Sequence, residues 1–371
     1  MMFQIKNFKK NKKFYSIILI VTFIGIGFTV IFSPSLTTAG TGYNPIITDT
    51  CTIFTASSGN TTLFGNNEDW RLNKVYMWCI PAQRISTVYS GERDIYGAIF
   101  LGFDNNVNDF DDVDGWEQGG MNEYGLCFDV NGLPDTQLNL GYDKIYPYTT
   151  HVIAQTLWEC KNVDEVIAWY GTHKWDVMGG QVHYADAKGD AVVVSASASG
   201  QWAFTRINSS EPYSFLVSTN FNLANPENGR YPCDRFTIAS QILDEITDES
   251  QVTVAKCAEV LHATHQERNS GTKYSNIFNP VQLKIYFNQG KTFSQQEEID
   301  LMEKLNEETK PINGFLGING DIQVYTEKVE TQYRSSLLSP GWWVFFGILG
   351  VAGGITTFFV IRKRNKRAIK Q

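Results

Sequence analysis

The chain has 371 residues, which is enough for one large domain or two ordinary ones. Its formal net charge of -8 hides an asymmetry, because residues 1–13 and 362–371 together carry 11 of the 31 basic residues and no acidic residue. The residues between them therefore carry 20 basic against 39 acidic side chains. A surface this acidic argues against nucleic acid and anionic lipid headgroups as ligands.

The first expected element is an uncharged apolar stretch of 19 residues, 14–32, which follows five lysines. The basic start and the Thr37-x-Ala39 sequence before Gly40 suit a signal peptidase, whereas the length of the apolar stretch also suits a retained membrane helix. We therefore expect residues 1–39 to be a signal peptide or a signal anchor, with cleavage favoured. A cut after Ala39 would leave residues 40–50 as a propeptide.

Residues 51–70 contain two β-branched and aromatic runs, 51–56 and 61–64, joined by a Ser-Gly-Asn turn, which predicts a β-hairpin. If the chain is cut before Cys51, that residue carries a thiol and a free α-amine. The amine, with a reference pKa of roughly 7.7 to 8.0, can act as base for the thiol of roughly 8.5. The alternatives are a buried structural cysteine and a lipoprotein cysteine, although the distance from the apolar stretch argues against the latter.

This stretch also carries a family resemblance. Cys-Thr-x-Phe followed by Phe-Gly-x-Asn-x-Asp-Trp resembles the start of the choloylglycine hydrolases, which are N-terminal-nucleophile amidases that include bile salt hydrolases and penicillin V acylases. Family-like motifs follow in order at 120–134, 183–194, 218–221, 234–236 and 274–287. The resemblance covers residues 51–290. It implies an α+β fold, a four-layer α/β/β/α sandwich.

The resemblance also implies a set of catalytic residues in this chain. They are Cys51, Asp69, Asn131, Asn220 and Arg235. Cys51 would attack an acyl carbonyl, Asp69 would orient its α-amine, and the two asparagines would donate to the oxyanion. Arg235, or less suitably Arg230, would favour the thiolate as a fixed cation. Turn-forming asparagines and an ordinary surface arginine are the competing interpretations.

One residue departs from the family pattern. Bile salt hydrolases usually have Phe-Gly-Arg-Asn-x-Asp, whereas this chain has Asn66 at the position of the arginine. The missing charge beside Cys51 leaves the fold assignment intact and counts against bile salts as substrates.

The other elements follow from periodicity and capping patterns. Strands are expected within 95–134, around an acidic loop at 104–117, and at 215–219, before a polar loop at 221–232. A β-hairpin is expected within 179–207 and a pair of strands within 274–287. Helices are expected at 150–160, after an N-cap at Asn162, at 236–246, after a cap at Ser250, and after a Ser294–Glu297 capping box.

No cofactor or metal is expected. Residues 111–115 lack the spacing of a calcium loop, and His262 and His265 lack a carboxylate at ligand spacing. We expect His183 to be a packed histidine. The six cysteines are irregularly spaced, so one disulfide is allowed and none is favoured.

A second apolar stretch of 21 residues, 341–361, predicts a transmembrane helix. Basic residues lie before the first apolar stretch and after the second. Both termini should therefore be cytoplasmic and the catalytic domain, 51–330, extracellular. Residues 331–340 would be a stalk and 362–371 a basic cytoplasmic tail.

We expect this membrane-anchored domain to hydrolyse a linear C–N amide bond in an N-acylated small molecule. The alternatives are an acyltransferase on the same fold and a catalytically silent binding module whose Cys51 is never unmasked. A homo-oligomer is compatible with the sequence.

Overall fold

A computed structural model of the chain describes residues 51–70, 75–87, 91–104, 115–148, 152–207, 212–267, 271–290 and 296–306. Both apolar stretches, the propeptide, the stalk, the basic tail and most of the acidic loop lie outside these ranges. Within them, no helix is long and apolar enough to cross a membrane.

A six-stranded antiparallel sheet contains the predicted hairpin at its centre. Its strands, in spatial order, are β12 (Ser214–Ser218), β1 (Thr52–Ser58), β2 (Thr61–Asp69), β15 (Thr272–Asn279), β16 (Lys284–Gln289) and β17 (Gln296–Asp300). The β1–β2 turn contains Gly59 with a φ of 57°, a conformation that glycine adopts without steric cost. The hairpin prediction is confirmed, and β2 continues to Asp69.

The second sheet has seven antiparallel strands. In spatial order they are β11 (Trp202–Ile207), β10 (Ala191–Ala196), β9 (Val177–Ala185), β8 (Cys127–Gln137), β7 (Gly115–Asn122), β6 (Ala98–Asp104) and β3 (Val75–Ile80). A separate hairpin consists of β4 (Gln83–Thr87) and β5 (Gly91–Ile95).

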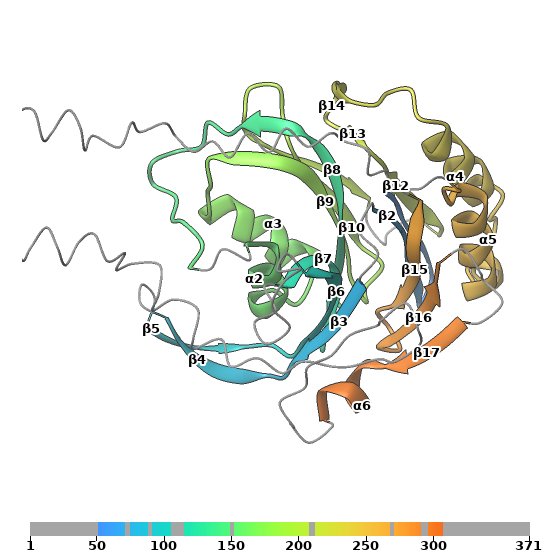
Figure 1. Cartoon of the computed structure of the whole chain (residues 1–371), viewed down its shortest axis with the longest axis horizontal. Helices are drawn as coiled ribbons and strands as arrows, with labels where there is room; N and C mark the ends of the chain where they lie inside the picture. Colours follow the sequence, from blue (N-terminus) through green and yellow to red (C-terminus); the bar gives the residue numbers. More distant parts are fainter. Residues whose placement is uncertain are drawn as a thin grey trace, which may run out of the picture. The chain divides into compact units, whose positions relative to one another are not determined.

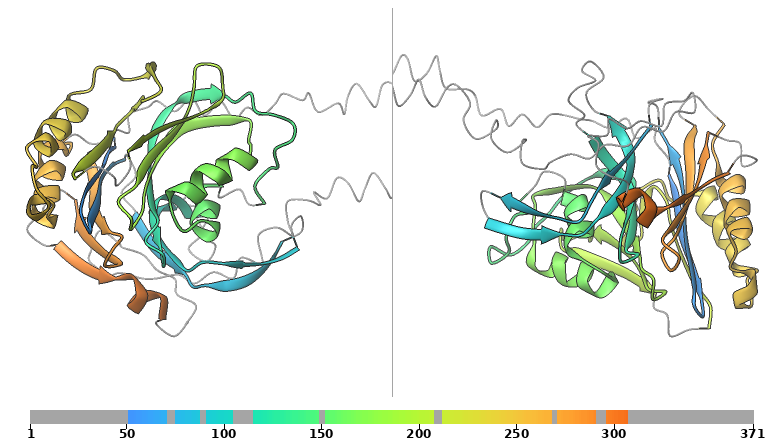
Figure 2. Two further views of the ribbon diagram at one scale, coloured as in Figure 1. Left: turned by 180° about the vertical axis from the view of Figure 1, so that it is seen from behind. Right: turned by 90° about the horizontal axis from the view of Figure 1, so that it is seen from below.

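Two pairs of helices cover the outer faces of the sheets (Figure 1). Helices α2 (Val152–Glu159) and α3 (Val163–Thr172) pack on the seven-stranded sheet, whereas α4 (Asp234–Asp244) and α5 (Val254–Thr264) pack on the six-stranded sheet. The view from below shows the order helices, sheet, sheet, helices (Figure 2). The predicted four-layer α/β/β/α sandwich is confirmed for the described residues.

Strand alternation divides the side chains among three apolar clusters. In β1, Phe54 packs toward α4 and α5, whereas Ile53 faces the other sheet. In β8, Phe128 packs toward α2 and α3, whereas Cys127 faces the six-stranded sheet. The inner faces of both sheets therefore form one shared core, and the polar side chains on those faces lie in it.

Two capping predictions were wrong. Ser250 lies inside a short 3₁₀ helix, η1 (Glu249–Gln251), and the side chain of Thr253 instead caps α5 by accepting from the backbone N–H of Lys256. The expected helix after Ser294 is β17, followed by the short helix α6 (Leu301–Asn306). Pairing of β17 with the edge of β16 buries Ile299 in the inter-sheet core, and this tertiary contact outweighs the local capping pattern.

The expected polar loop at 221–232 also contains structure. A small hairpin forms there from β13 (Phe221–Asn222) and β14 (Asn225–Gly229). The side chain of Asn222 accepts from the backbone N–H groups of Ala224 and Asn225, which closes the turn.

Candidate active site

Cys51 lies immediately before β1 and is buried, with 3% of its surface exposed. In the β1–β2 register, Thr52 pairs with Asn67 and Ile53 pairs with Asn66. The next position along each strand sets Cys51 opposite Glu68, on the same face as Ile53. The thiol therefore belongs to the inner face of the six-stranded sheet.

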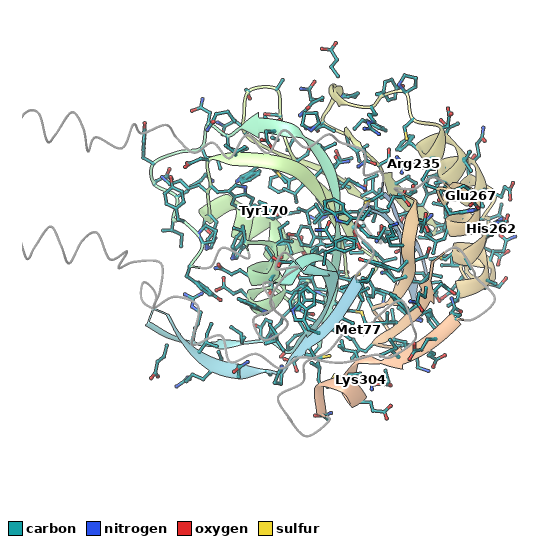
Figure 3. All side chains as sticks on the ribbon, viewed as in Figure 1. Met77, Tyr170, Arg235, His262, Glu267 and Lys304 are labelled. Atoms are coloured by element: carbon teal, nitrogen blue, oxygen red, sulfur yellow. The ribbon has the colours of Figure 1, made fainter. Side chains whose placement is uncertain are left out.

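Arg235 lies in α4, on the helical side of the six-stranded sheet (Figure 3). Its side chain reaches Cys51 and the start of β1. Its Nη1 donates to the carbonyl oxygen of Cys51 at 2.5 Å and to Oγ1 of Thr52 at 2.8 Å. Its Nη2 donates to Oδ1 of Asn220 at 3.0 Å, and Nη1 lies 4.0 Å from Oδ2 of Asp69. The buried guanidinium of Arg235 thus connects three other predicted site residues, Cys51, Asn220 and Asp69.

Asp69 is fully buried at the end of β2. Its Oδ1 accepts a hydrogen bond from Oγ1 of Thr272 at 2.5 Å. Its backbone N–H bonds the Cys51 sulfur and acts to lower the pKa of the thiol. Asp69 is therefore held by Thr272 and Arg235 beside the predicted nucleophile.

The thiol itself is not preformed as a thiolate. Burial raises the pKa of Cys51 well above its ordinary value, and the charges of Glu68, Asp69 and Asp129 raise it further. A fixed cation would instead lower the pKa of the thiol. Because Arg235 bonds to the backbone of Cys51, its geometry fits a positioning role for β1 better than activation of the thiol.

Asn131 lies on the inner face of β8 and is fully buried. Its Oδ1 accepts from Nε2 of Gln181 at 3.4 Å, whereas its Nδ2 has no hydrogen-bond partner among the described residues. A buried amide donor without a partner costs free energy, so natural proteins retain few of them. Asn131 thus has a donor available on the inner face.

Asn220 lies just after β12, and its side chain reaches β8. Its Nδ2 donates to the carbonyl oxygen of Gly132 at 3.0 Å, next to Asn131. Gln181 strengthens this connection, because its Nε2 also donates to the carbonyl oxygens of Thr219 and Phe221, each at 2.8 Å. The segment after β12 therefore brings Asn220 close to Asn131 of β8.

The remaining predicted residues have other roles in the structure. Arg230 is exposed, so Arg235 is the arginine that reaches Cys51. Asn66 donates to Glu68 and to Asn276, at 3.4 Å in each case. His183 packs between the sheets with its ring nitrogens bonded to Thr55 and Ser218, and burial lowers its pKa to about 3.

Neither a metal site nor a disulfide is formed by the described part of the chain. No group of three or more His, Cys, Asp or Glu side chains there could hold a metal ion. All six cysteines are described, and all are free thiols.

Sequence reasoning missed four residues that support this site. They are Glu68, Asp129, Gln181 and Thr272. The alternation within 127–131 could have identified Asp129, because it shares a face with Asn131. The strand register could likewise have set Glu68 opposite Cys51. No local pattern predicts Gln181 or Thr272, whose contacts depend on pairing between distant strands.

Comparison with known proteins supports the fold. A variant of the conjugated bile acid hydrolase from Clostridium perfringens matches with a TM-score of 0.52 and 15% sequence identity, over 75% of this chain and 99% of the hydrolase. Penicillin V acylase from Agrobacterium tumefaciens matches with a TM-score of 0.50 and 15% identity, over 75% of this chain and 94% of the acylase. No protein-family model and no curated protein sequence matches the chain. The fold implied by the resemblance to choloylglycine hydrolases is therefore confirmed, since the chain shares the fold of these two solved structures.

Proposed function

We propose that this protein is a cysteine amidohydrolase that cleaves a linear C–N amide bond in an N-acylated small molecule. The single observation that best supports the proposal is the Arg235 network, in which one side chain connects the start of β1, Asp69 and Asn220. A buried arginine with three hydrogen bonds fixes its partners in relation to one another. That fixed arrangement suits a nucleophile at Cys51.

In the proposed reaction, proteolytic removal of the residues before Cys51 exposes its α-amine. The amine takes the thiol proton as sulfur attacks the acyl carbonyl, and then delivers the proton to the departing amine. Water later hydrolyses the thioester and releases the acid. A base is needed because the pKa of the Cys51 thiol is raised by burial and by neighbouring carboxylates.

Asn131 and Asn220 are the proposed donors to the oxyanion that develops on the carbonyl oxygen. The partnerless Nδ2 of Asn131 supports this role most directly. Nδ2 of Asn220 already donates to Gly132, which leaves its second N–H for the oxyanion.

We also propose that the domain is held outside the cell membrane by residues 341–361, and by residues 14–32 where they are retained. The basic residues that precede residues 14–32 and follow residues 341–361 support this orientation. Asn66 stands at the position of the family arginine, and the missing charge supports a substrate other than a bile salt.

A panel of N-acyl amides tests the proposal. The processed protein, which begins at Cys51, should release acid and amine in equal amounts from at least one member, and Cys51→Ala should release neither. Added amine acceptors would divert the acyl group if the protein is a transferase. A mature chain that still begins upstream of Cys51 would contradict the mechanism, because no α-amine would then be available.

A further inference from the structure

Glu68 faces the thiol from the neighbouring strand. Thr52 pairs with Asn67, so the β1–β2 register continued by one residue sets Glu68 opposite Cys51. Side chains that oppose one another in an antiparallel pair have Cβ atoms about 4.5 to 5.5 Å apart. Glu68 is fully buried, and its charge acts on the thiol. The carboxyl group is thus a close neighbour of the sulfur.

Asp129 faces this region from the other sheet, because it pairs with His183 of β9, whose ring bonds to Thr55 of β1. Its charge raises the pKa of the Cys51 thiol. Asp129 is fully buried on the inner face of β8, and its Oδ1 accepts from the backbone N–H of Val130 at 2.8 Å. Its Oδ2 has no hydrogen-bond partner among the described residues. Gly119 pairs with Asp129 in the β7–β8 register, and a Cβ at that glycine would lie 2.3 Å from Oδ2. Glycine at this position therefore leaves the space that the carboxyl group occupies.

Two charged carboxylates in one buried space are unfavourable. Burial raises the pKa of Asp129 well above its ordinary value, and the charge of Glu68 raises it further. A proton on Asp129 removes one of the two charges.

Other titratable groups face this pair. On β15, burial and then the two carboxyls raise the pKa of Tyr274, which stays neutral. On β9, burial keeps His183 neutral between Thr55 and Ser218. Burial also raises the pKa of Cys127, which adjoins Asp129 on β8. Oδ2 of Asp69 lies 4.0 Å from Nη1 of Arg235.

We propose that Glu68 and Asp129 hold one proton between them at neutral pH, so that the pair presents a single negative charge to Cys51. They are positioning residues for the thiol, and this role rests on the proposed function of Cys51 as nucleophile. The proton resides on Asp129 and limits the charge that opposes thiolate formation.

The test measures the pKa of Cys51 from the pH dependence of its alkylation by iodoacetamide in the processed full chain, with the modified peptide identified by mass spectrometry. Asp129→Asn should leave the Cys51 pKa near its wild-type value, because it replaces a neutral acid by a neutral amide. The double variant Glu68→Gln/Asp129→Asn should lower it by about 1 to 3. Asp94→Asn, which removes an exposed carboxylate in β5, controls for net charge.

A second neutral variant, Asp129→Ser, serves if Asp129→Asn does not fold. Infrared spectra of the wild type at neutral pH should also contain the carbonyl band of a protonated carboxylic acid, and that band should disappear in the Asp129 variants. The proposal is overturned if the wild type lacks the band, if neutralising Asp129 alone lowers the Cys51 pKa, or if the double variant leaves it unchanged. Neither readout requires turnover, so failure to hydrolyse any amide would count against the proposed function alone.

Discussion

The guanidinium of Arg235 donates a hydrogen bond to the carbonyl oxygen of Cys51 at 2.5 Å. The two residues are 184 positions apart in the chain, so the start of β1 is fixed only when α4 has docked on the six-stranded sheet. A cation that bonds to backbone acts mainly on geometry. This relationship makes Arg235 a sensitive position for both stability and activity.

Replacement of Arg235 should separate charge from geometry. Arg235→Lys keeps the charge but loses the planar fork, so we expect kcat to fall by about 10²-fold through misplacement of Cys51. Arg235→Ala leaves buried acceptors without their donor and should cost about 3 to 5 kcal/mol in unfolding free energy. Urea unfolding and steady-state kinetics measure both effects.

Arg206 on β11 offers a matched control, because it pairs with Asp164 and Asp190 at a more exposed site. Arg206→Lys should change the unfolding free energy by about 1 kcal/mol or less. An Arg235→Lys variant with wild-type kcat would show that the geometry at Cys51 does not depend on the guanidinium.

Processing is the second prediction. The intact mass of the mature protein should fit a chain that begins at Cys51, because only that chain carries the α-amine. If removal of the preceding residues is autocatalytic, Cys51→Ala should retain them, whereas the control Cys233→Ala should be processed normally. Normal removal in Cys51→Ala would assign the cut to another protease.

Local signals predicted the parts of the fold that depend on nearby residues. The turn around Gly59, the cap of α3 at Asn162 and the β15–β16 pair were all readable because turn chemistry and alternation act over a few residues. The Ser294 prediction was wrong because pairing of β17 with β16 decided that segment.

The sequence predicted some residues of the candidate site and missed others. Cys51 and Asp69 belong to one hairpin, so a single motif contained both. Asn131 lies on β8 and Asn220 lies between β12 and β13, and only their family-like contexts linked them. Gln181 bonds Asn131 and the residues on either side of Asn220, but it carries no such context and is visible only through its hydrogen bonds in the folded structure.

The buried histidine predicts acid sensitivity. His183 has a folded pKa of about 3, below the unfolded value of about 6.5, so its contribution to stability is present above about pH 6.5 and is lost as pH falls toward 3. The full window is worth at most about 5 kcal/mol. Between about pH 7 and about pH 4, the free energy of unfolding should therefore decrease more in the wild type than in His183→Gln.

Carboxylates contribute equally to both proteins, so the difference in slope reports His183. His262→Gln, at an exposed position on α5, should retain the wild-type slope. Equal slopes in the wild type and His183→Gln would mean that His183 is protonated in the folded state.

Membrane topology gives the fourth prediction. A protease added to intact cells should digest residues 51–330 and spare the basic tail after Arg362, because positively charged flanks remain cytoplasmic. Permeabilised cells should lose the tail as well, which controls for its intrinsic resistance. Protection of residues 51–330 in intact cells would overturn the proposed orientation.

The last prediction concerns the oxyanion. If Asn131 donates its partnerless Nδ2 to the developing charge, Asn131→Ala should lower kcat by about 10²- to 10³-fold, a loss of roughly 2.7 to 4 kcal/mol, with little change in KM. Asn220→Ala should lower kcat and also stability, because it loses bonds to Arg235 and Gly132.

Asn279 is the matched control, because this strand-end asparagine accepts from the backbone N–H of Gln282 and shapes a turn. Asn279→Ala should cost about 1 kcal/mol of stability and keep normal turnover in the molecules that fold. Turnover is measured per titratable Cys51 thiol, so that unfolded or unprocessed protein is not counted. Because Asn131 and Asn279 are both buried asparagines, an equal effect of the two substitutions on this corrected kcat would remove Asn131 from the mechanism.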